Sequence, residues 1–374
     1  MSFFRYNSTQ FIKIIKVNFV THHTAFTDIE QSVIVPDSLA GLRLDQVLSE
    51  LFGDYSRSQL QKWLKAGDIV IDGQIKKAKD KLIGGEKIHL KTQLINQTQW
   101  QPEAMDLNII YEDGDIIVIN KPAGLVVHPG AGNPTGTLSN ALLAHDPAFQ
   151  LVPRAGIVHR LDKDTSGLMV AAKSLAAHTA LVESLSKRQV KREYEAIASG
   201  FLNKAGSIRT KMGRNPHHRL KMAVTPNGKD AITHVKIIEH YRAHTRIRCC
   251  LETGRTHQIR VHLQHIGAPL VGDPLYNPRL KLPKGSSEAL VQALRDFKRQ
   301  ALHAWRLGFI HPISGETLVF KAPLPNDLKQ LMRVLREDGK TLYHYEEDEF
   351  DFDDEFNDAF TGDFDDDQDD DDIE

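Results

Sequence analysis

The sequence predicts an α+β protein of two domains, the larger of which contains a mainly antiparallel sheet. Strand-like and helical segments follow one another with few clean βαβ repeats, which is typical of antiparallel sheets with helices packed on them. Residues 93–105 lack apolar periodicity and include the run QTQWQP, which predicts a linker. The chain of 374 residues is long enough for a core on each side of that linker. We therefore expect a small domain at 31–94 and a larger domain at 106–340.

The small domain is expected to hold two helices and two strands. Apolar residues recur at helical spacing between residues 42 and 52. Ser56 is suited to cap a second helix that runs to residue 64. The short apolar segments 69–71 and 87–90 lie next to glycines and predict strands.

The larger domain is expected to be richer in strands than in helices. Residues 112–114, Glu-Asp-Gly, are a hairpin signal between its first two strands. Period-two and period-3.6 patterns predict strands at 107–111, 115–119, 191–199, 231–239, 245–251, 304–310 and 317–320, and helices at 174–186 and 256–265.

Charge is distributed very unevenly along the chain. The formal net charge is only −2, but residues 346–374 contain 18 Asp or Glu and no Lys or Arg. The first 345 residues therefore hold 47 basic residues against 31 acidic ones, a formal charge of +16. Such a body is basic enough to attract a polyanion, although charge alone would also fit a basic protein with no such partner.

Both ends of the chain are predicted to lie outside the folded domains. Residues 1–30 read as a poorly ordered extension, because lysines interrupt their apolar character and no signal-peptide cleavage site follows. The tail at 346–374 reads as disordered, because blocks of like charge repel. Two hypotheses for the tail are an unstructured solvated segment and a competitor that folds back on the basic body.

The most informative segment is a charged loop between two apolar stretches, at residues 159–167. It places Arg160, Asp162 and Asp164 between the segments 156–158 and 168–172, so the loop is expected to be rooted in a core. A carboxylate there is costly unless a cation pairs with it. Asp162 and Asp164 could also be read as a glycosidase pair, but their spacing alone does not decide this.

Two segments carry a family resemblance. HRLDKDTSG at 159–167 and GRTHQIRVH at 254–262 resemble the HRLDxxTSG and GRTHQIRxH signatures of the RluA-type pseudouridine synthases. The runs NKPAGL at 120–125 and VPRAGIV at 152–158 are also similar to that family, and the resemblance extends from about residue 30 to about residue 340. It implies an S4-type RNA-binding domain, followed by a catalytic domain with a curved, bisected sheet and a cleft along it.

The implied reaction converts uridine in RNA to pseudouridine. The bond from ribose to ring nitrogen one breaks, and a bond to ring carbon five replaces it. The resemblance assigns Asp162 as the essential carboxylate, which either attacks the anomeric carbon or removes the neighbouring ribose proton. It assigns Arg255 as the cation that pairs with Asp162, and Tyr194 as the active-site aromatic residue. Asp164 falls at a variable position of the signature and is expected to be structural or exposed.

The uridine must leave its helix or loop to reach such a site. Arg160 matches the family arginine that enters the vacated space, and Ile259 and Val261 are candidate walls for the base or else members of a helix core. For the small domain, the resemblance suggests phosphate contacts from a cluster of basic residues, Arg43, Arg57, Lys62 and Lys65.

The expected partner is large-subunit ribosomal RNA or a pre-ribosomal particle. We expect no cofactor, no membrane segment and a cytoplasmic monomer. Cys249 and Cys250 are adjacent on a predicted strand and point to opposite faces, which disfavours a disulfide between them. We also expect no metal, because the histidines at 257, 262 and 265 lack the HExxH pattern. The alternatives are a non-catalytic RNA-binding or ribosome-assembly factor, which Asp162→Asn would distinguish, and a metal hydrolase, which a chelator would inactivate.

Overall fold

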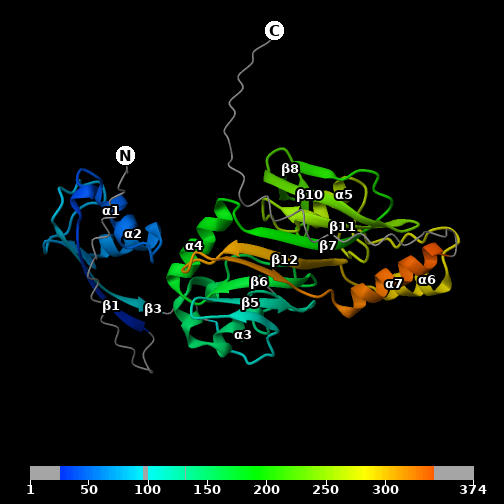
Figure 1. The fold of residues 1–374 in the computed structure, drawn as a ribbon, viewed down its shortest axis with the longest axis horizontal. Coiled ribbons are helices and arrows are strands. Elements are labelled where there is room, and N and C mark those ends of the chain that lie inside the picture. The colour runs from blue at the N-terminus through cyan, green and yellow to red at the C-terminus, as the bar shows by residue number, and fades with distance from the viewer. Residues whose placement is uncertain (1–25, 96–99, 131, 341–374) are drawn as a thin grey trace, which may run out of the picture.

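The computed structural model describes residues 26–95, 100–130 and 132–340. Figure 1 shows a small domain built from the first part of the described chain and a larger domain that contains the other described residues. The extension at 1–25 and the acidic tail at 346–374, for which disorder is expected, lie outside the described residues. The α+β class with a mostly antiparallel sheet is confirmed.

The small domain is a three-stranded antiparallel sheet with two helices. Its elements are β1 (Phe26–Ile34), α1 (Leu44–Leu51), α2 (Arg57–Ala66), β2 (Ile69–Ile71) and β3 (Lys87–Ile95), with strand order β1-β3-β2. The Oγ atom of Ser56 accepts a hydrogen bond from Gln59 N and caps α2, as its sequence predicts. Leu44, Val47, Leu60 and Trp63 bury the inner faces of the two helices against the sheet.

One boundary of the small domain was wrong. The sequence assigned residues 26–30 to a poorly ordered extension, yet they form the first half of β1 and pair with β3. The segment FTDIEQSVI is mostly polar, and Ile29 and Val33 are its buried apolar residues in the described part. A strand with so few apolar residues is recognisable only once its partner is known.

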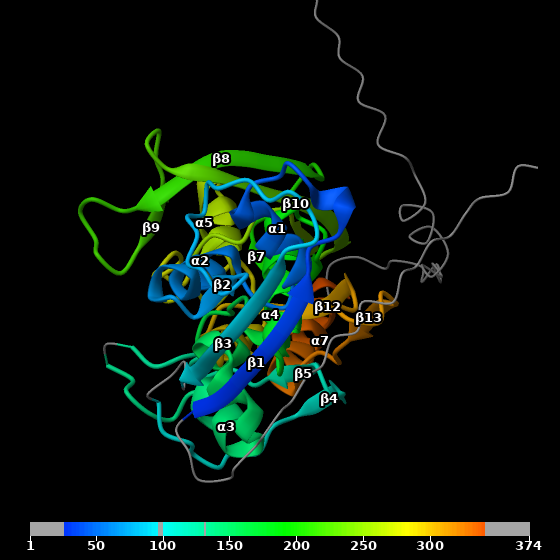
Figure 2. The same cartoon turned by 90° about the vertical axis from the view of Figure 1, so that its left-hand side faces the viewer.

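The larger domain is organised around a ten-stranded sheet. Its order is β4-β5-β6-β12-β7-β11-β10-β8-β9, with β13 beside β12. The strands are β4 (Ile109–Glu112), β5 (Ile116–Lys121), β6 (Ser166–Ala172), β7 (Lys191–Ser199), β8 (Gly206–Arg214), β9 (Met222–Val224), β10 (Lys229–His240), β11 (His244–Leu251), β12 (Leu302–Ile310) and β13 (Thr317–Lys321). Figure 2 shows β8 and β9 projecting at one edge. These two strands were not predicted, and most of β8 is exposed.

The sheet consists of two halves that meet between β6 and β12. This contact is parallel and pairs only His303 with Ser166 and Ala304 with Gly167, whereas the other pairings of the sheet are antiparallel. Gly167 has φ +113°, and a Cβ atom there would overlap the backbone of Ala304. The glycine of the 159–167 motif is therefore required by the close approach of the two halves.

Helices cover both the faces and the ends of this sheet. They are α3 (Leu138–His145), α4 (Leu175–Ser186), α5 (Gln258–His265), α6 (Glu288–Asp296) and α7 (Asn326–Lys340), and α6 and α7 form a pair at one end of the sheet (Figure 1). Leu175, at the start of α4, packs against the core of the small domain. None of the helices in the described part of the chain is long and apolar enough to cross a membrane.

Candidate active site

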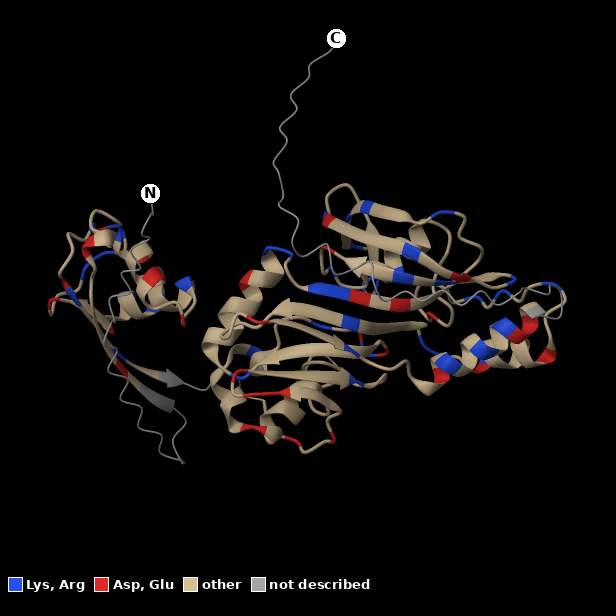
Figure 3. Ribbon diagram, in the orientation of Figure 1, with Lys and Arg blue, Asp and Glu red and all other residues tan. Residues whose placement is uncertain are grey.

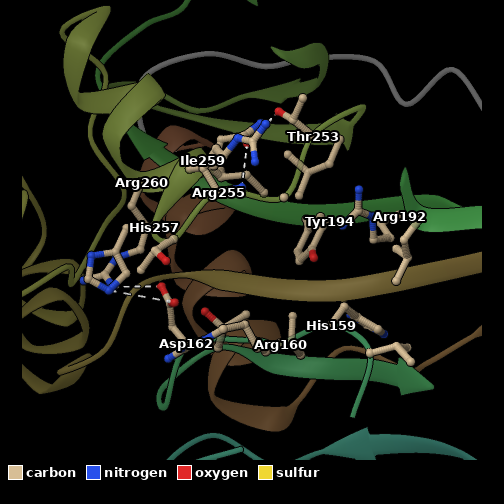
Figure 4. A pocket seen from close by; sticks show the side chains of 18 of the residues that line it. His159, Arg160, Asp162, Arg192, Tyr194, Thr253, Arg255, His257, Ile259 and Arg260 are labelled. Atoms are coloured by element: carbon tan, nitrogen blue, oxygen red, sulfur yellow. Dashed lines mark hydrogen bonds and ion pairs between the residues drawn. The ribbon is translucent and has the colours of Figure 1, made fainter. Parts of the chain in front are cut away.

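The charged loop before β6 forms one side of a pocket of about 480 Å³. The other sides come from β7, from the turn after β11 and from the start of α5. Five of the sequence-predicted residues line this pocket together: Arg160, Asp162, Tyr194, Arg255 and Ile259. Figure 4 shows Asp162 facing α5, and Tyr194 lies on β7.

Asp162 is held by an ion pair with Arg260. Arg260 Nη1 lies 2.9 Å from Asp162 Oδ2, and the side chain of Asp162 is 17% exposed. The second carboxylate oxygen, Oδ1, is 3.8 Å from Nε2 of His257. Oδ1 is therefore the oxygen of Asp162 that remains available to a molecule in the pocket.

Arg260 is fixed in turn by a second, fully buried carboxylate. Its Nε and Nη2 atoms donate to Asp273 Oδ2 at 2.7 Å and Oδ1 at 2.8 Å. Burial works against the charge of Arg260, yet the hydrogen bonds and charges of Asp273 and Asp162 raise the pKa of Arg260 well above its ordinary value. The guanidinium is thus permanently charged and has one preferred orientation.

The predicted pairing of Arg255 with Asp162 was wrong. Arg255 is exposed, and its Nε atom donates to the main-chain oxygen of Asp230 at 3.0 Å. The physical reason is the left-handed conformation of His257, at φ 58°, after which α5 begins at Gln258. Arg255 therefore precedes the helix, whereas Arg260 lies in its first turn and faces the 159–167 loop.

Lys121, which sequence reasoning did not single out, donates hydrogen bonds that hold the 159–167 loop in place. It is fully buried at the end of β5, and its Nζ atom lies 2.8–2.9 Å from the carbonyl oxygens of Pro122, Leu125 and Lys163. Burial lowers the pKa of Lys121 to about 7, opposed mainly by the charges of Asp164 and Asp162. The sequence signal for this role was the position of Lys121, a charged residue directly after the largely apolar segment IIVIN.

Tyr194 lies on β7 with 6% of its surface exposed. Burial raises the pKa of Tyr194 to about 12, against the lowering effect of the Arg192 charge. The phenol therefore stays protonated at neutral pH and presents a ring and a hydrogen-bond donor to the pocket.

The remaining predicted pocket residues differ in their positions. Arg160 is exposed at the pocket and Ile259 lines it, but Val261 packs away from it in a cluster with Met212, Ala231 and Tyr276. Val261 is thus part of the core, which is the second of the two roles considered for it from the sequence. Asp164 is partly exposed, and its main-chain oxygen accepts a hydrogen bond from Arg299 at 3.3 Å.

The three histidines considered as metal ligands are separated by their contacts. His257 Nδ1 is 2.8 Å from the Tyr276 hydroxyl, whereas His262 lies between the hydroxyls of Thr210 and Thr233. His265 is exposed at the end of α5. Within the described ranges, no three His, Cys, Asp or Glu residues form a group that could hold a metal ion.

The four basic candidates of the small domain are all exposed. Arg43 forms a two-point contact with Asp45, with both distances 3.0 Å. Arg57, Lys62 and Lys65 lie on α2, which carries basic residues in Figure 3. Part of the charge of Arg43 is therefore already compensated, whereas no ion pair to the three α2 residues occurs in the described structure.

Comparisons with known proteins show what the two domains are similar to. Residues 115–265 match the model of the RNA pseudouridylate synthase family, and residues 42–88 match the S4 domain. The "Ribosomal large subunit pseudouridine synthase D" of Xanthomonas campestris pv. campestris is 56% identical over 309 residues, which cover 83% of this chain and 93% of that protein. The protein of the same name from Escherichia coli strain K12 is 51% identical over 311 residues, which cover 83% and 95%.

Among solved structures, human RNA pseudouridylate synthase domain containing 4 is 25% identical with a TM-score of 0.48, covering 61% of this chain and 93% of that one. The sequence matches are far closer, and they span nearly the full length of the bacterial relatives. The chain belongs to the RNA pseudouridylate synthase family, and its first domain is an S4 domain.

Proposed function

We propose that this synthase isomerises specific uridines to pseudouridine in large-subunit ribosomal RNA. The observation that carries the proposal is the Asp162 carboxylate, which Arg260 and Asp273 hold at the wall of a pocket lined by Tyr194. The names of the bacterial relatives support the large ribosomal subunit as the source of the RNA. A bacterial ribosomal RNA substrate would place the enzyme in the cytoplasm.

Asp162 is the group that acts on the ribose. Its Oδ2 atom is engaged by Arg260, so Oδ1 is the oxygen that meets the sugar of a bound uridine. From there it either attacks the anomeric carbon or takes the neighbouring ribose proton, and both routes release the base from ribose. The Arg260 ion pair favours the ionised carboxylate that either route requires.

The detached uracil must turn and reattach without escaping. Tyr194 offers a flat surface and a protonated hydroxyl, and Leu161, Ile259 and Leu302 provide apolar wall next to it. A pocket with such walls retains the uncharged parts of the base while it rotates, so that ring carbon five reaches the ribose.

The RNA is held from outside the pocket. Arg160, exposed at the pocket, fills the space that the flipped uridine leaves in its helix or loop. Arg43, Arg57, Lys62 and Lys65 of the S4 domain contact phosphates, so salt weakens binding steeply. The enzyme acts as a monomer on ribosomal RNA or a pre-ribosomal particle, and it uses neither a metal nor a cofactor.

The test is pseudouridine mapping on large-subunit ribosomal RNA treated with wild-type protein and with Asp162→Asn. We expect new pseudouridine with the wild type only. Equal modification by both proteins would remove Asp162 from the chemistry. If neither protein modifies the RNA while both bind it, the chain acts as a binding factor or on another RNA, and activity that is lost in EDTA would indicate a metal.

A further inference from the structure

Arg192 is a buried arginine in the active-site pocket whose charge no neighbour neutralises. It is the second residue of β7, two positions before Tyr194, and both side chains line the pocket. Arg192 is 8% exposed, whereas Arg154, Arg160 and Arg255 of the same pocket are exposed to solvent. Figure 4 shows Arg192 beside Tyr194 and near His159.

The guanidinium of Arg192 has no hydrogen-bond partner among the described residues. Its Nε atom is sealed from solvent without a hydrogen-bond partner, and the described residues contain no ion pair or hydrogen bond to its guanidinium. Gly254 packs against the guanidinium, since a Cβ atom on Gly254 would lie 2.7 Å from Arg192 Nη1. His159 and Tyr194, the titratable groups beside it in the pocket, are neutral at physiological pH.

The carboxylates closest in sequence and space already have partners. Glu193 and Glu195 alternate with Arg192 on β7 and therefore point to the opposite face, where they pair with Arg306 and with Arg246 and Arg248. Glu252 in the pocket is 2.9 Å from Arg188 Nη1 and 2.6 Å from His234. Asp162 forms its ion pair with Arg260.

A buried guanidinium without an anion costs folding free energy, because its desolvation is not offset. Such a residue is expected where a ligand supplies the anion and where the site is selected for binding rather than for stability. The pocket as a whole agrees, because Arg154, Arg160 and Arg255 also have no carboxylate partner in the described structure.

The position of Arg192 indicates which anion this is. Figure 4 shows Arg192 on the far side of Tyr194 from Asp162, and the same pocket is also lined by Ser186, the last residue of α4, and by Arg188 just after it. The other end of α4 contacts the S4 domain through Leu175, and the charge of Arg57 on α2 acts on Glu183 of α4. A strand of RNA that runs from the base pocket toward the S4 domain would therefore pass Arg192.

We propose that Arg192 binds a phosphodiester group of the RNA within two nucleotides of the target uridine. Two Nη amino groups match the two free oxygens of a phosphodiester, whose single negative charge also neutralises the guanidinium. A uracil carbonyl would satisfy one donor but leave the charge uncompensated. The proposal rests on the proposed RNA substrate and adds a phosphate site to the base pocket.

The test measures RNA binding, so it stands apart from the test of activity. Arg192→Gln is compared with wild type in an Asp162→Asn background, on a large-subunit stem-loop with single methylphosphonates at each phosphate within two nucleotides of the target. Where wild type modifies no uridine, each loop uridine is scanned in the same way. We expect Arg192→Gln to weaken binding about tenfold to a hundredfold. At one phosphate position, the methylphosphonate should weaken binding to the protein that keeps Arg192 by the same factor as the substitution Arg192→Gln does. The same methylphosphonate should not weaken binding to Arg192→Gln any further.

Two further variants separate a phosphate contact from a structural role. Gly254→Ala keeps the charge of Arg192 but crowds Nη1, and its φ is not in the left-handed region, so it should weaken binding at the same phosphate. Arg192→Gln should unfold at the same temperature as wild type or higher, whereas Arg306→Gln on the opposite face should unfold earlier, because it leaves Glu193 buried without a partner. Loss of stability in Arg192→Gln, or the absence of any phosphate coupled to Arg192, would overturn the proposal.

Discussion

Arg260 Nη1 and Asp162 Oδ2 lie 2.9 Å apart and join two segments that are separated by 98 residues in the chain. The contact ties the first turn of α5 to the loop before β6. Because Asp273 holds the other side of the same guanidinium, Asp162 is the exposed end of a buried chain of three charges.

The first prediction concerns the two arginines of the segment 254–260. Arg260→Gln should lower the free energy of unfolding by about 3–5 kcal/mol, because it leaves Asp273 buried without its cation. It should also release Asp162 and abolish pseudouridine formation. Thermal unfolding and single-turnover kinetics on a mapped RNA measure the two effects.

Arg255→Gln is the matched control. Arg255 is exposed and donates only to a main-chain oxygen, so its removal should change stability by less than about 1 kcal/mol. Should Arg255→Gln unfold earlier than Arg260→Gln, the assignment of the pairing arginine would be reversed.

The sequence predicted the segments of the site but not their pairing. HRLD and GRTHQIR were correctly expected to meet, because a carboxylate between apolar stretches needs a cation. The left-handed conformation of His257 sets the start of α5 and so decides which arginine pairs with the carboxylate. The spacing of residues in the sequence does not predict that conformation. Lys121 and Arg192 were missed for a related reason, since burial of a cation is decided by distant segments that pack over it.

The same reasoning explains the outcome for the fold. Helices with a clear apolar face, such as α1 and α2, were predicted to within a few residues. The strands β1 and β8 were not, because their mixed sequences become strands only through the pairing with β3 and β10.

The second prediction concerns Lys121. Lys121→Met removes the donor to three carbonyl oxygens, including that of Lys163 next to Asp162, at a cost of about 1–3 kcal/mol for each carbonyl left without a partner. The turnover number should fall, because the loop that carries Asp162 loses its support. Faster hydrogen exchange at residues 162–165 than in wild type is the direct measurement.

The pH dependence of the Lys121 variant supplies a second readout. The folded pKa of about 7 lies below that of an unfolded lysine, so between pH 7 and about 10 the unfolded chain binds a proton that the folded chain does not. The stability that wild type has relative to Lys121→Met should therefore increase as the pH rises through that window. A pH-independent difference would mean that Lys121 keeps its proton in the folded protein.

The third prediction concerns the junction of the two sheet halves. Gly167→Ala should destabilise the protein by more than about 3 kcal/mol, since it adds a clash with the Ala304 backbone to an unfavourable φ. Gly200→Ala is a suitable control, because Gly200 has φ +102° but open space around its Cβ position, so it carries only the backbone cost of about 1–3 kcal/mol. Equal unfolding temperatures for the two variants would contradict the close approach of β6 and β12.

The last prediction concerns acid stability. Burial lowers the pKa of His159 to about 3, and those of His244, His262 and His303 to about 4. The unfolded chain therefore takes up protons on these side chains between about pH 6.5 and 4, whereas the folded chain does not. The stability is fully present above pH 6.5 and should fall as the pH drops, by at most about 1.4 kcal/mol per pH unit for each histidine.

His303→Gln tests this with one side chain. His303 Nδ1 is 2.9 Å from the hydroxyl of Ser166, a contact that glutamine can also make without taking up a proton at mild acidity. Urea unfolding at several pH values should give a shallower loss of stability between pH 6.5 and 4 in His303→Gln than in wild type. Parallel slopes for wild type and His303→Gln would show that His303 is protonated in the folded protein, and the sheet junction would then have to accommodate a charge next to Ser166.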